Sequence, residues 1–145
     1  MKRAIGILLL AAAASACSDS TGLEANDLAG TWGATVWELT NPAVADQSVD
    51  VLAAGGSLTI MFNSDSTFTS TILDPGETIP DVDTGTYEVV GSVLTIAESG
   101  SGSPTPFQAV RDGNTLTLTS SDGDYDWDDN GTDDPANERI VLSRQ

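Results

Sequence analysis

The chain has 145 residues, with 22 Asp or Glu against five Lys or Arg, no histidine and a formal net charge of −17. So negative a surface repels phosphate backbones, which excludes a nucleic acid as the expected partner. Without histidine, Ser-His and Cys-His nucleophile pairs and histidine-bound zinc are excluded too. Lys2 is the only lysine, so the rest of the chain offers neither a Schiff base nor a phosphate-binding glycine loop. We therefore expect a protein that is not an enzyme.

Residues 1–16 have the pattern of a secretory signal. A short basic start, Lys2 and Arg3, precedes an apolar run over residues 4–14, which is too short to span a bilayer. Small residues then lead into Cys17, the only cysteine, so no disulfide can form within one chain. Removal of the signal would leave three arginines against all 22 acidic residues, a charge of −19.

The stretch Ala14-Ser15-Ala16-Cys17 resembles the lipobox of bacterial lipoproteins, although Ala14 stands where Leu is usual. The resemblance implies that Cys17 is lipidated, becomes the mature N-terminus and anchors the protein to a membrane; a free structural thiol is the alternative. In enteric bacteria an Asp directly after the cysteine resembles an inner-membrane retention signal, and Ser18 stands there instead. We therefore expect a protein of the cell envelope, with the outer membrane favoured.

Residues 17–28 are expected to form a flexible tether that carries the lipid, and residues 29–145 a single domain. In that domain, short runs of alternating apolar and polar residues are separated by turn residues at regular spacing. We expect eight strands, over residues 31–40, 57–62, 67–73, 84–90, 93–97, 107–111, 115–119 and 140–143. The stretch 43–56 is the longest irregular one and could hold a short helix.

The alternation places apolar side chains on one face of the strands and Ser or Thr on many positions of the other. An all-β, antiparallel, eight-stranded meander can bury its apolar face by closing into a small barrel. Such an interior is either filled by side chains or holds one small ligand, and short strands favour a filled or nearly filled one. Any pocket is expected to be lined by residues that otherwise simply fill the core: Trp37, Leu58, Ile60, Phe62, Phe68, Ile72, Tyr87, Leu94, Ile96, Phe107 and Leu118.

The motif Gly30-Thr31-Trp32 at the first strand resembles the lipocalins and their wider calycin relatives. Together with residues 57–59, 63–68 and 85–87, it is similar to small bacterial lipocalin-like lipoproteins. The resemblance implies a barrel that binds a small hydrophobic molecule. It also implies that Trp32 packs near a C-terminal arginine at the closed end. Arg139 or Arg144 could make that contact through a cation–π interaction, the alternative being a core tryptophan and a surface arginine.

Residues 122–134 form an acidic segment in which Asp126-x-Asp128-x-Asn130-Gly131 fits the first half of a calcium loop. The expected ligands are Asp126, Asp128, Asn130, Thr132 and Asp134. The twelfth position, where a bidentate Glu belongs, holds Asn137. Two alternatives stay open. The segment can be a solvated acidic turn, or its two aromatic residues, Tyr125 and Trp127, can pack on the barrel while the acids face water.

The sequence as a whole favours a lipid-anchored, exported protein that binds a small apolar molecule, or serves an envelope role on that scaffold, without catalysis. The alternative is a structural or interaction module of the cell envelope that Ca²⁺ stabilises. No cofactor is implied beyond this candidate Ca²⁺. One barrel hosts many functions, so the fold alone does not choose between the two hypotheses.

Overall fold

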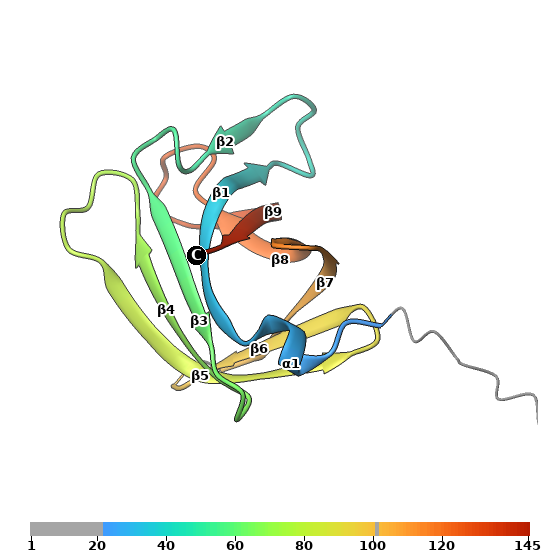
Figure 1. Cartoon of the computed structure of the whole chain (residues 1–145). Coiled ribbons are helices and arrows are strands. Elements are labelled where there is room, and N and C mark those ends of the chain that lie inside the picture. The colour runs from blue at the N-terminus through green and yellow to red at the C-terminus, as the bar shows by residue number, and fades with distance from the viewer. Residues whose placement is uncertain (1–21, 101) are drawn as a thin grey trace, which may run out of the picture.

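A computed structural model describes residues 22–100 and 102–145 (Figure 1). The predicted signal and Cys17 lie outside the described residues. The elements are α1 (Ala25–Leu28), β1 (Gly30–Thr40), β2 (Ser48–Asp50), β3 (Ser57–Phe62), β4 (Thr67–Leu73), β5 (Asp81–Val90), β6 (Val93–Glu98), β7 (Thr105–Asp112), β8 (Thr115–Tyr125) and β9 (Asp134–Arg144). In this part of the chain, no helix has the length and apolar character needed to cross a bilayer.

The strands form one antiparallel sheet in the order β2-β1-β3-β4-β5-β6-β7-β8-β9, and an additional pairing of β1 with β9 closes it. Eight strands therefore make a barrel, and the short β2 is an extra strand on the far half of β1. The first half of β1, residues 30–33, pairs with β3, whereas residues 38–40 pair with β2. The predicted all-β, eight-stranded antiparallel barrel is confirmed.

The structure differs from the prediction where local signals are weak. The stretch 43–56 contains β2 and no helix. The sequence did not predict β2, because a strand of three residues is too short to give a periodic signal. β8 and β9 extend to Tyr125 and Asp134, which shortens the predicted acidic loop to residues 126–133. Asp and Gly are poor strand formers, so only the pairing of these two strands with each other decides these positions.

α1 lies across one end of the barrel (Figure 1). Its last residue, Leu28, is completely buried in the core, so the final residues of the predicted tether belong to the domain. Beside it pack Phe62 and Tyr87, whose rings meet edge to face at 4.9 Å, and the Tyr87 hydroxyl donates a hydrogen bond to the Asn63 carbonyl over 2.7 Å. We call this the closed end. The largest fully buried side chains of the described residues belong to the core cluster around Trp32: Leu28, Trp32, Phe62, Leu94, Leu116, Leu118 and Leu142.

Arg144 covers Trp32 at the closed end. Its guanidinium carbon lies 4.6 Å from the centroid of the buried indole, and its two terminal nitrogens donate to the carbonyls of Ala29 and Asp27 over 2.9 and 2.6 Å. Gly30 has a φ of 130°, and a Cβ there would stand 3.2 Å from Nη1 of Arg144, so the motif needs glycine. Of the two arginines expected here, Arg144 makes the contact, and Arg139 is exposed on β9 across from Glu38.

Residues 22–145 hold the whole closed sheet and the core cluster around Trp32. The closed sheet and its packed interior thus lie within the described residues, which fits a domain that folds on its own.

A candidate ligand cavity at the open end of the barrel

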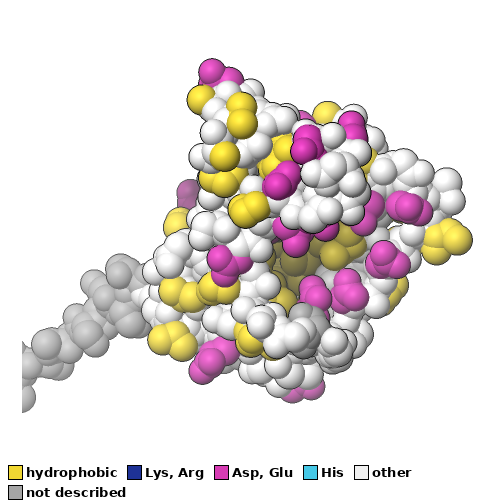
Figure 2. Space-filling model, turned by 180° about the vertical axis from the view of Figure 1, so that it is seen from behind, with side chains coloured by type: hydrophobic (Ala, Val, Ile, Leu, Met, Phe, Trp, Pro, Cys, Tyr) yellow, Lys and Arg dark blue, Asp and Glu magenta, His cyan; other side chains and the backbone are white. Residues whose placement is uncertain are grey.

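The barrel is hollow at the end opposite α1, where a cavity of about 620 Å³ opens to the surface. We call it the open-end cavity. Figure 2 shows the hollow, with apolar side chains in its floor and acidic side chains around it. Its apolar lining comes from strands on opposite sides of the barrel and from the segments after β2 and β4: Trp37, Leu39, Val51, Leu58, Ile60, Phe68, Ile72, Pro75, Ile96, Phe107, Tyr125 and Ile140.

The alternation along each strand builds this lining. In β3, Leu58 and Ile60 point inward and are buried. In β4, Phe68 points inward opposite Gly85 of β5, where a Cβ would stand 2.8 Å from the phenyl ring. Glycine at position 85 therefore leaves the space that the Phe68 ring occupies beside β5. Ser70, the one buried polar side chain among the described residues, leaves room above that ring and lines the cavity.

The predicted pocket residues divide between the two ends of the barrel. Seven line the open-end cavity: Trp37, Leu58, Ile60, Phe68, Ile72, Ile96 and Phe107. The other four pack into the main core instead: Phe62, Tyr87, Leu94 and Leu118. The expectation of a filled interior thus describes the closed end, where α1 and large side chains occupy the space, and it is wrong for the open end.

Carboxylates are the part of the lining that the sequence analysis missed. Six of them line the cavity: Asp74, Glu98, Asp122, Asp124, Asp133 and Glu138. We call them the cavity carboxylates. The lining contains no Lys or Arg among the residues described. A signal for Glu138 was present, because the predicted last strand, extended by two residues, places position 138 on the inward face with Ile140 and Leu142.

Glu138 is half-buried in the cavity wall. Its Oε1 accepts a hydrogen bond from the Trp37 indole nitrogen over 2.8 Å, which links β9 to β1. Burial raises the pKa of the Glu138 carboxyl above its ordinary value of 4.5, the hydrogen bond from Trp37 opposes that rise, and the nearby charge of Asp124 adds to it. The carboxyl group is therefore fixed in position and incompletely solvated.

The loop between β8 and β9 packs on the open end through its aromatic residues. The rings of Tyr125 and Trp127 lie 4.8 Å apart, and both pack against a small cluster formed by Leu39, Val51 and Ala136. The Trp127 indole nitrogen also donates to the carbonyl of Pro135 over 3.2 Å. The structure therefore favours the alternative in which the aromatic residues of this segment pack on the barrel.

The expected calcium ligands form a chain of tight turns. The Asp126 carboxylate accepts hydrogen bonds from the backbone nitrogens of Asn130 and Gly131 over 3.0 and 2.7 Å, and that from Gly131 lowers the pKa of Asp126 most. The Asn130 amide oxygen accepts from the Thr132 nitrogen over 2.8 Å. Asp134 begins β9 opposite Tyr125. Across residues 22–100 and 102–145, no three Asp, Glu, Cys or His gather as metal ligands do, and the calcium site stays a prediction.

Residues 28–118, more than half of the chain, match the family model described as a lipocalin-like domain. The chain belongs to this lipocalin-like family. No curated protein matches it. The matched residues run from Leu28 to the middle of β8, so they include the walls of the lipocalin-like barrel formed by β1 and by β3 to β7. Four of the cavity carboxylates, Asp122, Asp124, Asp133 and Glu138, lie beyond the match.

Proposed function

We propose that this lipocalin-like protein binds a small, mainly apolar molecule in the open-end cavity and does not catalyse a reaction. The observation that carries the proposal is the cavity itself, about 620 Å³ with apolar walls from opposite sides of the barrel. Ligand pockets in proteins measure about 300–1,000 Å³ and combine apolar walls with a few polar groups. The absence of histidine from the sequence supports a binding role over an enzymatic one.

A fluorescence titration tests the binding. Residues 22–145 are titrated with N-phenyl-1-naphthylamine, a neutral apolar dye whose emission rises when it leaves water. We expect saturable binding to the folded protein, and its loss in Ser70→Phe, where the new ring occupies the cavity next to Phe68. Thr71→Phe is the matched control, because position 71 faces the outside of the same strand. Equal dye binding by both variants would refute the assignment of the site.

The proposal includes export and a lipid anchor on Cys17, with the outer membrane favoured. Its support is the signal pattern of residues 1–16 and the small residues before the cysteine. Metabolic labelling of the full chain with palmitate in an expressing bacterium tests it. We expect label on the protein in the outer-membrane fraction, and none on Cys17→Ser. Label retained by Cys17→Ser, or none on the parent protein, would contradict the anchor.

A further inference from the structure

We infer that the open-end cavity selects a ligand with a positively charged amine attached to an apolar body, and discriminates against apolar anions such as fatty acids. The inference rests on the proposed function, since it names the chemical class of the molecule held in the same cavity. The cavity supplies the site, and the distribution of charge around it decides which ligand chemistry the site accepts.

The cavity carboxylates have no cationic neighbour in the lining of the site. Arg111 pairs with Asp27 over 3.1 Å, and Asp27 belongs to α1 at the closed end. Arg144 lies over Trp32 at the same end. Arg139 is exposed and follows the inward-pointing Glu138 in β9, so it faces the outer surface. None of the three arginines of the described chain therefore lines the cavity, and its carboxylates have no cation among the lining residues.

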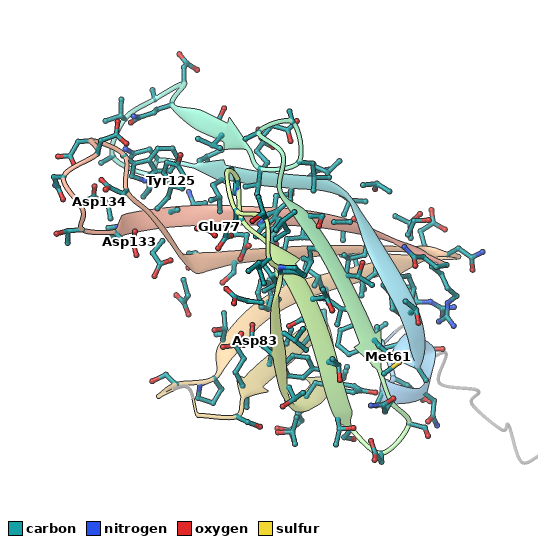
Figure 3. The ribbon with its side chains drawn as sticks, turned by 90° about the vertical axis from the view of Figure 1, so that its left-hand side faces the viewer. Met61, Glu77, Asp83, Tyr125, Asp133 and Asp134 are labelled. Carbon is teal, nitrogen blue, oxygen red and sulfur yellow. The ribbon has the colours of Figure 1, made fainter. Side chains whose placement is uncertain are left out.

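Three further acidic residues lie outside the lining itself. Figure 3 labels Glu77 in the loop between β4 and β5, Asp83 in β5 and Asp134 at the start of β9, next to Asp133 of the lining. These residues come from separate elements around the open end. A concave site of one charge sign with low-dielectric walls concentrates its field in the opening. An apolar cation is attracted into such a site, whereas an apolar anion is repelled before it reaches the apolar floor.

Glu138 holds a carboxylate at a defined position inside the cavity. Its hydrogen bond from Trp37 uses Oε1, and within the described chain no hydrogen bond is made to Oε2. A carboxylate accepts several hydrogen bonds, and an ammonium group has three donors and no acceptor. An ammonium head can therefore hydrogen-bond to Glu138 while its apolar body contacts Ile60, Phe68 and Phe107 in the same cavity. It would also neutralise a carboxylate that burial now destabilises in its charged form.

An organic cation fits this arrangement better than a divalent metal ion does. Ca²⁺ needs six to eight oxygen ligands that converge on one point. The cavity carboxylates are spread over the ends of β4, β6, β8 and β9, and no group of three is placed to hold a metal in the described part of the chain. The apolar side chains of the lining also offer nothing to a bare metal ion. They offer contact area to an alkyl chain or an aromatic ring.

Three ligands with the same apolar body test the inference: decylamine, decanol and decanoate. Each displaces N-phenyl-1-naphthylamine from residues 22–145 at pH 7, in EDTA and well below the concentration at which it forms micelles. We expect decylamine to bind at least about tenfold more tightly than decanol, and decanoate to bind most weakly, since a hydrogen bond between charged groups outweighs a neutral one. Added NaCl should weaken decylamine binding and leave decanol binding unchanged.

Two variants locate the effect. Glu138→Gln keeps the hydrogen bond from Trp37 and removes the charge, so we expect it to lose most of the preference for decylamine over decanol. Asp124→Asn, at the exposed rim, should lose a smaller part. Glu88→Gln is the matched control, because the same change in charge is made on the outer face of β5, next to the inward-pointing Tyr87, and it should keep the full preference.

The outcomes separate the two proposals. If neither the dye nor decanol binds, the proposed binding function itself fails. If the dye and decanol bind but decylamine binds no better than decanol, the function stands and the inference about charge is overturned. Preferred binding of decanoate, or decanoate binding that appears only with CaCl₂, would overturn it too, the latter because a metal ion would then be the partner of the carboxylates. If Glu138→Gln and Glu88→Gln keep the preference for decylamine equally, the assignment of Glu138 as the partner of the ammonium group is overturned.

Discussion

Replacement of Arg144 by methionine tests whether the closed end depends on a single charged side chain. Methionine keeps an unbranched apolar stem of similar reach and removes the guanidinium. The change deletes the contact with Trp32 at 4.6 Å and the hydrogen bonds to the carbonyls of Ala29 and Asp27. The carbonyls then lose their donors in a partly buried environment, where an unsatisfied polar group costs about 1–3 kcal/mol.

The magnitude follows from these contacts. A cation–π contact of a desolvated guanidinium is worth about 2 kcal/mol, and each hydrogen bond from a charged donor about 1.5–3 kcal/mol. These contributions overlap because one side chain makes them all. The buried Nε of Arg144, which has no hydrogen-bond partner among the described residues, also lowers the total. We expect a net loss of about 3 kcal/mol in the free energy of unfolding, and a fall in Tm of roughly 10 °C.

Urea unfolding of residues 22–145, followed by Trp fluorescence and by far-UV circular dichroism, measures the loss. Arg139→Met is the matched control, since it removes the same charge five residues earlier in β9, from an exposed position. It should change the free energy of unfolding by less than about 0.5 kcal/mol. Equal stability of the two variants would refute the reasoning, because the contacts of Arg144 would then add nothing beyond the loss of one positive charge.

Three further predictions concern the cavity and its rim. The pKa of Glu138 in the folded protein lies above 4.5, so the stability of the protein falls as pH rises through that raised pKa. Glu138→Gln should therefore have a higher Tm than the parent protein at pH 7 and lose this advantage below about pH 4.5. A difference in Tm that stays constant with pH would contradict the prediction. Millimolar CaCl₂ after EDTA should leave the Tm unchanged, because main-chain donors already hold Asp126; a rise of roughly 10 °C that is lost in Asp126→Ala and Asp128→Ala would establish the calcium module instead. Gly85→Ala should destabilise the barrel by at least about 1–3 kcal/mol in urea unfolding, since its Cβ would meet the Phe68 ring and the Ala97 carbonyl, and an unchanged midpoint would show that β5 can move aside.

The sequence predicted the strands correctly where alternation along the strand and turn residues at its ends both gave a local signal. The bounds of β3 and β4 match the predicted 57–62 and 67–73, because Leu58, Ile60 and Phe68 alternate with polar residues between clear turn residues. The charge of the chain, the absence of histidine and the motif of residues 30–32 likewise follow directly from the sequence. Each of these properties depends on residues close together in the chain or on composition alone.

The site could be predicted only in part, because its decisive contacts join distant residues. The hydrogen bond from Trp37 to Glu138 spans 101 positions, and the pairing of β1 with β9 that brings them together has no local signature. Whether an inward-pointing apolar residue fills the core or lines a cavity depends on what lies opposite. Phe62 meets Tyr87 under α1, whereas Phe68 faces open space beside Ser70.

By itself, then, the sequence determined an acidic, all-β chain with a lipocalin-like strand pattern, since alternation and turn chemistry act within a few residues. Only the tertiary structure decided that the barrel is filled at one end and hollow at the other. It also decided that none of the three arginines of the described chain lines the cavity while six carboxylates do. The physical reason is that closure of the sheet fixes which side chains share a volume and which charges share a field, and neither is encoded within a single strand.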